Sequence, residues 1–201
     1  MTERRIIGFS SDDIPISRRE ALRYMGISGE ISEDLVSSLD KNEALLRRGI
    51  SARCVYTRLA LGATASGVRL GDTELESRSL AKALADCGNA YVFAATLGAD
   101  VDRSIRRASA VSSADGVVLD ALASAAIEGV CNMLCKHLGD GLVLCPRFSP
   151  GYGDLPLGTQ SSLLSLLDAQ RSIGLCLTAS LMMTPSKSVT AIVGIKNKDQ
   201  K

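Results

Sequence analysis

The chain has 201 residues, of which 46% are hydrophobic, so it can bury one substantial core and is not intrinsically disordered. Its 23 basic and 22 acidic residues leave a net charge of +1, and 3% of residues are aromatic, which disfavours a nucleic-acid partner. We also expect no membrane partner and a soluble, cytoplasmic protein, because no apolar run approaches a membrane span and charged residues come too early for a secretory signal.

One domain is expected over residues 1–201, with a helical N-terminal part at 1–50 and a mixed sheet with helices at 51–201. Ser17 can cap a helix that Gly26 ends, and a second helix is expected over 32–48. The segment ARCVYTRLAL is then rich in β-forming residues, and SGVRLG follows after a short turn, which predicts a β-hairpin.

In the middle of the chain we expect a helix over 72–87 and a buried strand over 91–96, followed by a glycine turn and another helix. A strand, a glycine turn and a helix can bind phosphate on backbone amides. Asp100 and Asp102 lie at the start of this helix and would repel an anion, so we do not expect a phosphate site here.

The helix expected over 116–137 has two unlike faces, one an apolar stripe typical of core contact. The other face carries small side chains and one carboxylate, and consists of Ala121, Ser124, Ala125, Glu128 and Asn132. Burying a lone carboxylate costs several kcal/mol. Glu128 therefore either reaches solvent or an internal arginine, or meets a positively charged group of a small ligand.

The segment RFSPGYGDLP, residues 147–156, places two prolines and two glycines around Tyr152, which fixes a backbone path. Arg147 offers a planar fork that suits a carboxylate. From the sequence alone, Arg147 can equally form an ion pair with Asp154 or Glu128. GLVLC before this loop is expected to form a short strand.

A leucine-rich helix capped near Thr159 or Ser161 follows, and two β-rich pieces, GLCLT and SVTAIVGI, come after it. Strands and helices are interspersed without a βαβ rhythm, which favours an α+β fold with a mixed or antiparallel sheet. The lysines from Lys187 to Lys201 are expected to form a solvated end.

The six cysteines are expected to be reduced thiols that act as small hydrophobic side chains. Cys131, Cys135 and His137 lie close in sequence. The histidine would project away from the helix face of the two cysteines, and no second cluster completes four ligands, so we expect no metal site.

Four segments together resemble the activation domain of vitamin B12-dependent methionine synthase, above all its stand-alone bacterial forms. They are RFSPGYGDLPL, the earlier FAATLGADVDRSIRR with ASAAIEGV, and the later GLCLTASLMMTPSKSVTAIVGI. The likeness extends from the helix near Ser17 to the strand at Ile195. Its most specific part is Arg-x-x-x-Gly-Tyr at 147–152, and Pro-x-Lys-Ser-Val at 185–189 supports it.

The resemblance implies an α+β fold with helices around a twisted, mainly antiparallel sheet and a shallow groove that binds S-adenosylmethionine. It implies an accessory role in the reductive methylation of cob(II)alamin on a separate cobalamin-dependent methionine synthase. A flavodoxin-like or ferredoxin-like donor would supply the electron, and methyl transfer from S-adenosylmethionine would trap cob(I)alamin. Cobalamin would be supplied by the partner, so the chain alone is not a complete methionine synthase.

By the same resemblance, Arg147 holds the carboxylate of the methyl donor, Glu128 lies near its cationic part, and loop amides and carbonyls face its adenine. Asp12 and Asp13 fall where the family has an acidic residue that contacts the donor. No catalytic residue and no metal ligand are implied. The implied S-adenosylmethionine-binding residues are Arg147, Ser149, Pro150, Gly151, Tyr152, Gly153 and Glu128.

Two other functions stay open at this level. The chain could be a non-catalytic interaction module that docks on a corrinoid protein, or it could activate a different corrinoid methyltransferase. A ligand that binds the folded state must raise its thermal stability. If saturating S-adenosylmethionine did not shift the thermal stability of the chain, the first alternative would be favoured.

Overall fold

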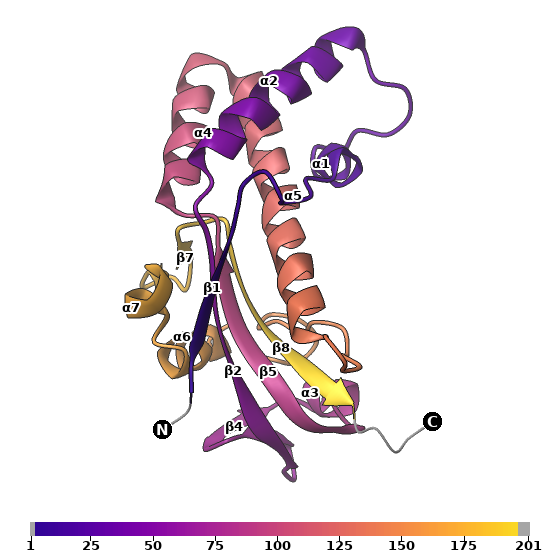
Figure 1. Ribbon diagram of the computed structural model, residues 1–201, viewed down its shortest axis with the longest axis vertical. Coiled ribbons are helices and arrows are strands. Elements are labelled where there is room, and N and C mark those ends of the chain that lie inside the picture. The colour runs from indigo at the N-terminus through magenta and orange to yellow at the C-terminus, as the bar shows by residue number, and fades with distance from the viewer. Residues whose placement is uncertain (1–2, 197–201) are drawn as a thin grey trace.

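A computed structural model describes residues 3–196 of the chain. Its centre is a sheet of order β4-β3-β2-β5-β8, with β1 paired to β2, and every pairing in it is antiparallel (Figure 1). A two-stranded hairpin, β6–β7, lies apart from this sheet. The strands are β1 (Arg5–Phe9), β2 (Ala52–Ala63), β3 (Gly67–Leu70), β4 (Thr73–Glu76), β5 (Cys87–Thr96), β6 (Cys176–Leu177), β7 (Met183–Thr184) and β8 (Ser188–Lys196).

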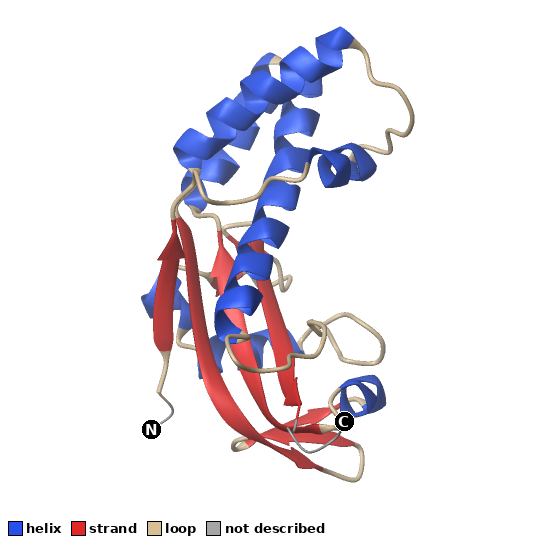
Figure 2. Cartoon of the chain, turned by 45° about the vertical axis from the view of Figure 1, so that its right-hand side comes forward, coloured by secondary structure: helices blue, strands red, loops and turns tan. Residues whose placement is uncertain are grey.

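Helices cover both faces of the sheet, which confirms the predicted α+β fold (Figure 2). The long helix α5 packs on one face, and α6 and α7 pack on the other. Helices α1, α2 and α4 gather around α5 beyond the end of the sheet. The helices are α1 (Arg18–Tyr24), α2 (Glu33–Gly49), α3 (Arg78–Ala83), α4 (Ala99–Val111), α5 (Ser113–Leu138), α6 (Thr159–Leu166) and α7 (Ala169–Ile173).

Strand β5 shows why the sheet needs cover on both sides. Successive side chains of a strand point to opposite faces. Phe93 and Ala95 accordingly belong to the core under α5, and Val92 and Ala94 belong to the core under α6 and α7. A strand buried on both faces reads as an apolar run, as YVFAAT does in the sequence.

By length and composition, α5 could cross a membrane, which corrects the expectation that no apolar run approaches that length. Within the structure, 67% of its apolar window is buried, and the core helix of a folded domain meets the same criteria. Helix α5 contacts α1, α2, α4 and two strands of the sheet, so it is the central helix of this fold.

The predicted N-terminal helices are confirmed, and so is the predicted cap of the first helix at Ser17; the cap of the second helix at Ser32 was not predicted. The Ser17 hydroxyl accepts a hydrogen bond from the Glu20 amide, and the Ser32 hydroxyl accepts one from the Leu35 amide. The N-terminal part is not helical throughout, however, because β1 pairs along the edge of β2.

The predicted hairpin is confirmed as β2–β3, but the helix expected over 72–87 is wrong at both ends, because only Arg78–Ala83 is helical and β5 already begins at Cys87. Residues Thr73–Glu76 form β4, which hydrogen-bonds to β3, and α3 begins at Arg78. Strand β4 pairs with β3, the strand immediately before it. The helical spacing of the apolar residues over 72–87 gave no sign of this pairing.

The leucine-rich helix expected near Thr159 or Ser161 is divided into α6 and α7. Helix α6 begins at Thr159 without a side-chain cap, so the predicted cap is wrong. Asp168 has φ +47° and lies between the two helices, because a left-handed residue cannot continue an α-helix.

Candidate ligand-binding site

The loop that carries Arg147 runs beside the edge strand β8. GLVLC does not form the expected strand; single bridges join Leu144 to Ile195 and Phe148 to Ile192. The Phe148 amide donates to the Ile192 carbonyl at 2.9 Å, and the Ile192 amide donates back at 2.8 Å. Phe148 packs into the core under α6 and α7, and Arg147 projects to the side where α5 lies.

Arg147 binds two side chains of α5. Its Nη2 lies 2.6 Å from Oε2 of Glu128, and its Nη1 donates to Oδ1 of Asn132 at 3.1 Å. The arginine side chain is 24% exposed and that of Glu128 is 42% exposed, so the pair borders solvent. Of the two ion pairs that the sequence left open, the structure contains the one with Glu128.

These contacts belong to a polar stripe on α5 that the sequence analysis recognised in part. Asp120, Ser124, Glu128 and Asn132 recur every fourth residue and therefore share one face of the helix. Lys187 Nζ lies 2.9 Å from Asp120 Oδ1 and donates to Ser124 Oγ at 2.9 Å. Lys187 thus binds the first half of the stripe, and Arg147 binds the second half.

The predicted loop residues fold into a tight turn. The Tyr152 amide donates to the Ser149 carbonyl at 3.2 Å, and the Gly151 amide donates to the Leu155 carbonyl at 2.9 Å. Pro150 is buried beneath this turn. These two amides are used within the turn, so a ligand beside them would first meet carbonyl oxygens and side chains.

Gly153 serves the packing of the loop. It has φ +56°, which favours glycine, and a Cβ atom there would lie 2.8 Å from Cβ of Ser79 in α3. The absence of a side chain therefore lets the loop approach α3 closely, a role that the sequence analysis did not identify.

Asp154 caps α3, another role that the sequence analysis missed. Its carboxylate accepts hydrogen bonds from the Ser77 hydroxyl, from the Arg78 amide at 2.9 Å and from the Ser79 amide at 3.1 Å. The bond from Ser77 and the two amide bonds lower the pKa of Asp154 to about 2.

We expect Asp154→Asn to lower the thermal midpoint of unfolding. The difference in midpoint between the wild type and the variant should depend on pH. The unfolded carboxyl has a pKa of about 4, so the wild-type advantage is fully present above that pH and disappears as pH falls toward about 2. Thermal scans of both proteins from neutral to acid pH measure it. Asp86→Asn is the control, since Asp86 is exposed; an equal loss at all pH values would contradict the capping role.

Tyr152 stands out from the loop. Its side chain is 69% exposed, and within residues 3–196 its hydroxyl has no hydrogen-bond partner. Leu157, also exposed, lies next to Gly151. The phenol is therefore available to a ligand or to a docked protein.

A groove lies beside the Arg147 cluster, between the N-terminal segment and the last turns of α5. It has a volume of about 720 Å³ and touches the cluster through Asn132, although residues 149–153 are not part of its lining in the described structure. Of the two early acidic residues, Asp13 lines it. The lining residues are Phe9, Asp13, Pro15, Asn132, Met133, Lys136, His137 and Asp140.

A glycine of α5 explains why the N-terminal segment lies there. A Cβ atom at Gly129 would lie 2.2 Å from the Pro15 carbonyl oxygen and 3.4 Å from a methyl group of Ile14. The chain can cross α5 at this height because Gly129 has no side chain. Small residues on this helix indeed admit a close neighbour, and here the neighbour is backbone.

The six cysteines are free thiols, and most are buried. Burial raises the pKa of Cys54 to about 12 and raises the pKa of Cys131 as well, which keeps these thiols protonated and weakly nucleophilic. Among residues 3–196, no group of three or more His, Cys, Asp or Glu side chains is placed to hold a metal ion.

Comparisons with known proteins bear on both the loop and the fold. The sequence model of the family "Vitamin B12 dependent methionine synthase, activation domain" matches residues 144–200, which include the Arg147 loop and β8. Among solved structures, the MetH reactivation domain bound to AdoHcy has a TM-score of 0.76 at 15% identity, over 100% of this chain and 80% of that chain. No curated protein matches the sequence. The resemblance that the motifs indicated is thus confirmed: the chain is similar to the activation domain of vitamin B12-dependent methionine synthase, in sequence over residues 144–200 and in fold throughout.

Proposed function

We propose that the chain binds S-adenosylmethionine and supports the reductive methylation of cob(II)alamin on a separate cobalamin-dependent methionine synthase. The partner's cobalamin, once reduced to the cobalt(I) state by a flavodoxin-like or ferredoxin-like donor, supplies the nucleophile that accepts the methyl group. The support is a fold shared with a domain that carries AdoHcy, the product left when S-adenosylmethionine gives up its methyl group.

The observation that carries the proposal is the Arg147–Glu128 pair. The methionyl end of S-adenosylmethionine has a carboxylate and an ammonium group on one carbon atom. Arg147 and Glu128 present a cation and an anion side by side, with 2.6 Å between Nη2 and Oε2. When such a ligand binds, its carboxylate pairs with Arg147 and its ammonium group pairs with Glu128. These two pairs replace the Arg147–Glu128 pair of the free protein, so neither protein charge loses its partner.

The rest of the donor fits the surroundings of this pair. The adjacent groove of about 720 Å³ falls within the usual range for small-ligand sites. Asp13 lies in its wall and can accept hydrogen bonds from the ribose hydroxyls or the ammonium group. Ser149, Pro150 and Gly151 would offer carbonyl oxygens at the Arg147 end.

This chain needs no acid, base or nucleophile of its own for such a reaction. Methyl transfer from a sulfonium to a strong nucleophile depends on the alignment of donor and acceptor, so positioning supplies the catalytic effect. Arg147 and Glu128 would hold the donor, and the exposed Tyr152 would face the docked cobalamin protein. We also propose a cytoplasmic location, since all six cysteines are free thiols, as in a reducing compartment.

Reconstitution tests the proposal. The chain is mixed with S-adenosylmethionine, a chemical reductant and a methionine synthase that carries cob(II)alamin but lacks its own activation domain. We expect the absorption spectrum of methylcobalamin to appear, and to appear more slowly with Arg147→Ala. Binding of S-adenosylmethionine without methylation would favour a different corrinoid methyltransferase as partner. No binding at all would leave a non-catalytic interaction module.

A further inference from the structure

One wall of the groove beside the Arg147 cluster is formed by a segment that has no regular secondary structure over most of its length. Phe9, Asp13 and Pro15 line the groove, and all three lie in the stretch from the last residue of β1 to the start of α1. We call residues 9–15 the strap, and Figure 1 shows it crossing α5 on its way to α1. The shape of the groove therefore depends on what holds the strap.

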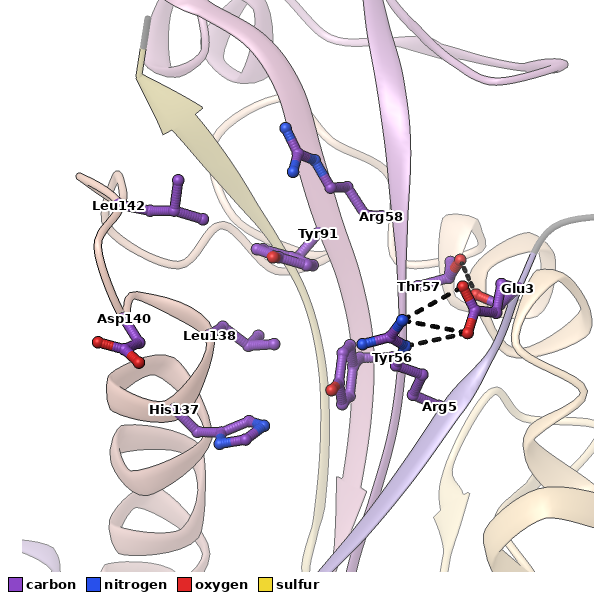
Figure 3. Close-up of a pocket in the computed structure, with 10 residues that line it drawn as sticks. All are labelled: Glu3, Arg5, Tyr56, Thr57, Arg58, Tyr91, His137, Leu138, Asp140 and Leu142. Carbon is purple, nitrogen blue, oxygen red and sulfur yellow. Dashed lines mark hydrogen bonds and ion pairs between the residues drawn. The ribbon is translucent and has the colours of Figure 1, made fainter. Parts of the chain in front are cut away.

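The two ends of the strap are fixed by the sheet and by α1. Strand β1 pairs with β2 along its whole length. Figure 3 shows part of this pairing at the edge of the neighbouring cavity of about 390 Å³, where Arg5 of β1 lies beside Tyr56 of β2 and is held by Glu3. At the other end, the hydroxyl of Ser17 caps α1. The position of the groove wall is thus decided between these ends.

The middle of the strap has few contacts of its own. Ile14 is 1% exposed and packs in the core under α5, which fixes one side chain. The turn before it carries Asp13, which is exposed. Among the described residues, the only backbone hydrogen bond of this turn runs from the Asp13 amide to the Ser10 carbonyl at 3.1 Å. An exposed turn with one such bond opens easily unless other groups bind it.

Arg47 of α2 binds this turn at both ends. Its Nη1 donates to the Ile14 carbonyl at 3.3 Å and also to the Ser11 carbonyl, and these two residues flank the acidic pair that includes Asp13. Its Nε and Nη2 donate to Oε1 of Glu43 at 3.2 and 2.9 Å. A guanidinium is planar with its donors in fixed directions, so a carboxylate that binds one side of it orients the other.

The same carboxylate joins the two ends of this contact network. Oε2 of Glu43 accepts hydrogen bonds from Nε and Nη2 of Arg18 at 3.2 and 3.1 Å, and Arg18 is the first residue of α1. The side chain of Glu43 is 18% exposed, so these bonds are largely screened from water. Helix α2 therefore holds the middle of the strap through Arg47 and the helix that follows the strap through Arg18.

We propose that Arg47 is a positioning residue of the ligand site, which it shapes without touching the ligand. Arg47 does not line the groove. It acts through the backbone on either side of Asp13 and so fixes the wall that Asp13 and Pro15 form. The identity of the ligand in this inference rests on the proposed function, whereas the order of the strap does not.

Hydrogen exchange on the ligand-free chain tests the order of the strap. Arg47→Met keeps the aliphatic stem and removes the donors, so we expect about tenfold faster exchange in peptides that cover residues 10–16 and little change in β2 and β5. Arg48→Met is the matched control, because Arg48 is the exposed neighbour of Arg47 on the same helix. Unchanged exchange of the strap in Arg47→Met would overturn the proposal, whether or not the chain binds S-adenosylmethionine.

Isothermal titration with S-adenosylmethionine tests the effect on the site. It is done at a temperature at which circular dichroism shows every variant to be folded, so a general loss of stability does not contribute. A strap that is in place about a tenth of the time lowers the apparent affinity about tenfold, which is the loss expected for Arg47→Met. Arg47→Lys keeps the charge and should lose less, and Arg48→Met should lose nothing.

A double-variant cycle shows whether Arg47 acts through the wall. Asp13→Asn should weaken S-adenosylmethionine binding in the wild type and much less in Arg47→Met, because both changes disturb the same wall. Full affinity in Arg47→Met, or losses that simply add in the double variant, would overturn the proposal. No binding by the wild-type chain would refute the proposed function instead, and the exchange result would then decide on Arg47.

Discussion

Replacing Arg147 with alanine is expected to weaken the binding of S-adenosylmethionine by about 1.5–3 kcal/mol, or about tenfold to a hundredfold. The substitution removes a charge-assisted partner of the ligand carboxylate. It also leaves Glu128 without the guanidinium that lies 2.6 Å away in the free protein. Isothermal titration of both proteins with S-adenosylmethionine measures the change.

The choice of ligand makes this test specific. 5′-Methylthioadenosine has the adenosine and the sulfur but lacks the carboxylate and the ammonium group, so Arg147→Ala should hardly change its affinity. Arg53→Ala serves as the matched protein control, because Arg53 is an exposed arginine far from the loop in sequence and on another strand. Unchanged S-adenosylmethionine affinity in Arg147→Ala would remove this arginine from the site.

Gly129→Ala is expected to destabilise the protein by about 1–3 kcal/mol, the usual cost of overpacking. The new Cβ would lie 2.2 Å from the Pro15 carbonyl oxygen, and backbone at that distance must move. Alanine favours a helix over glycine, so the intrinsic helix preference acts in the opposite direction and is outweighed. Denaturant unfolding monitored by circular dichroism gives the free energy of unfolding.

This substitution also reports on the groove. The segment that must move continues to Asp13, which lines the groove, so we expect weaker S-adenosylmethionine binding in the folded fraction of Gly129→Ala. Gly158→Ala is the control, because a Cβ at that position meets nothing within 4 Å. Stability equal to the wild type would show that the N-terminal segment does not lie against α5.

Much of the local structure follows from short stretches of sequence. Ser17 and Ser32 precede apolar helical patterns, and a cap is a contact between residues three apart, so the first helices could be predicted. The β2–β3 hairpin is local in the same sense. The central helix was predicted within three residues at each end, because its apolar periodicity is long.

Most of the mispredicted parts depend on distant partners. Strand β1 forms because residues near position 7 pair with residues near position 54. Strand β4 is the exception, because it pairs with β3 immediately before it, and the two-residue turn between Leu70 and Thr73 was overlooked. The 141–145 segment, expected as a strand, reaches β8 only at the single bridge between Leu144 and Ile195. Neither the β2 edge that β1 joins nor the β8 edge is visible in a window of neighbouring residues.

The candidate site divides in the same way. Arg147 and Glu128 were selected from the sequence because each is a charge among small, apolar or rigid neighbours, and the structure brings them into contact across 19 positions of the chain. The roles of Gly153 and Asp154 at α3, the crossing of Pro15 at Gly129 and the Lys187 contacts were not foreseen. Each joins segments that are at least 60 residues apart.

The sequence by itself determined the Ser17 cap, the apolar periodicities, the β2–β3 hairpin and the family resemblance, because these depend on residue type and on neighbours a few positions away. Tertiary structure alone decided which distant strand edges pair, which charge neutralises Arg147 and which polar groups face a cavity. Those outcomes depend on the packing of α5 against the sheet, where a side chain meets a partner that no local spacing encodes.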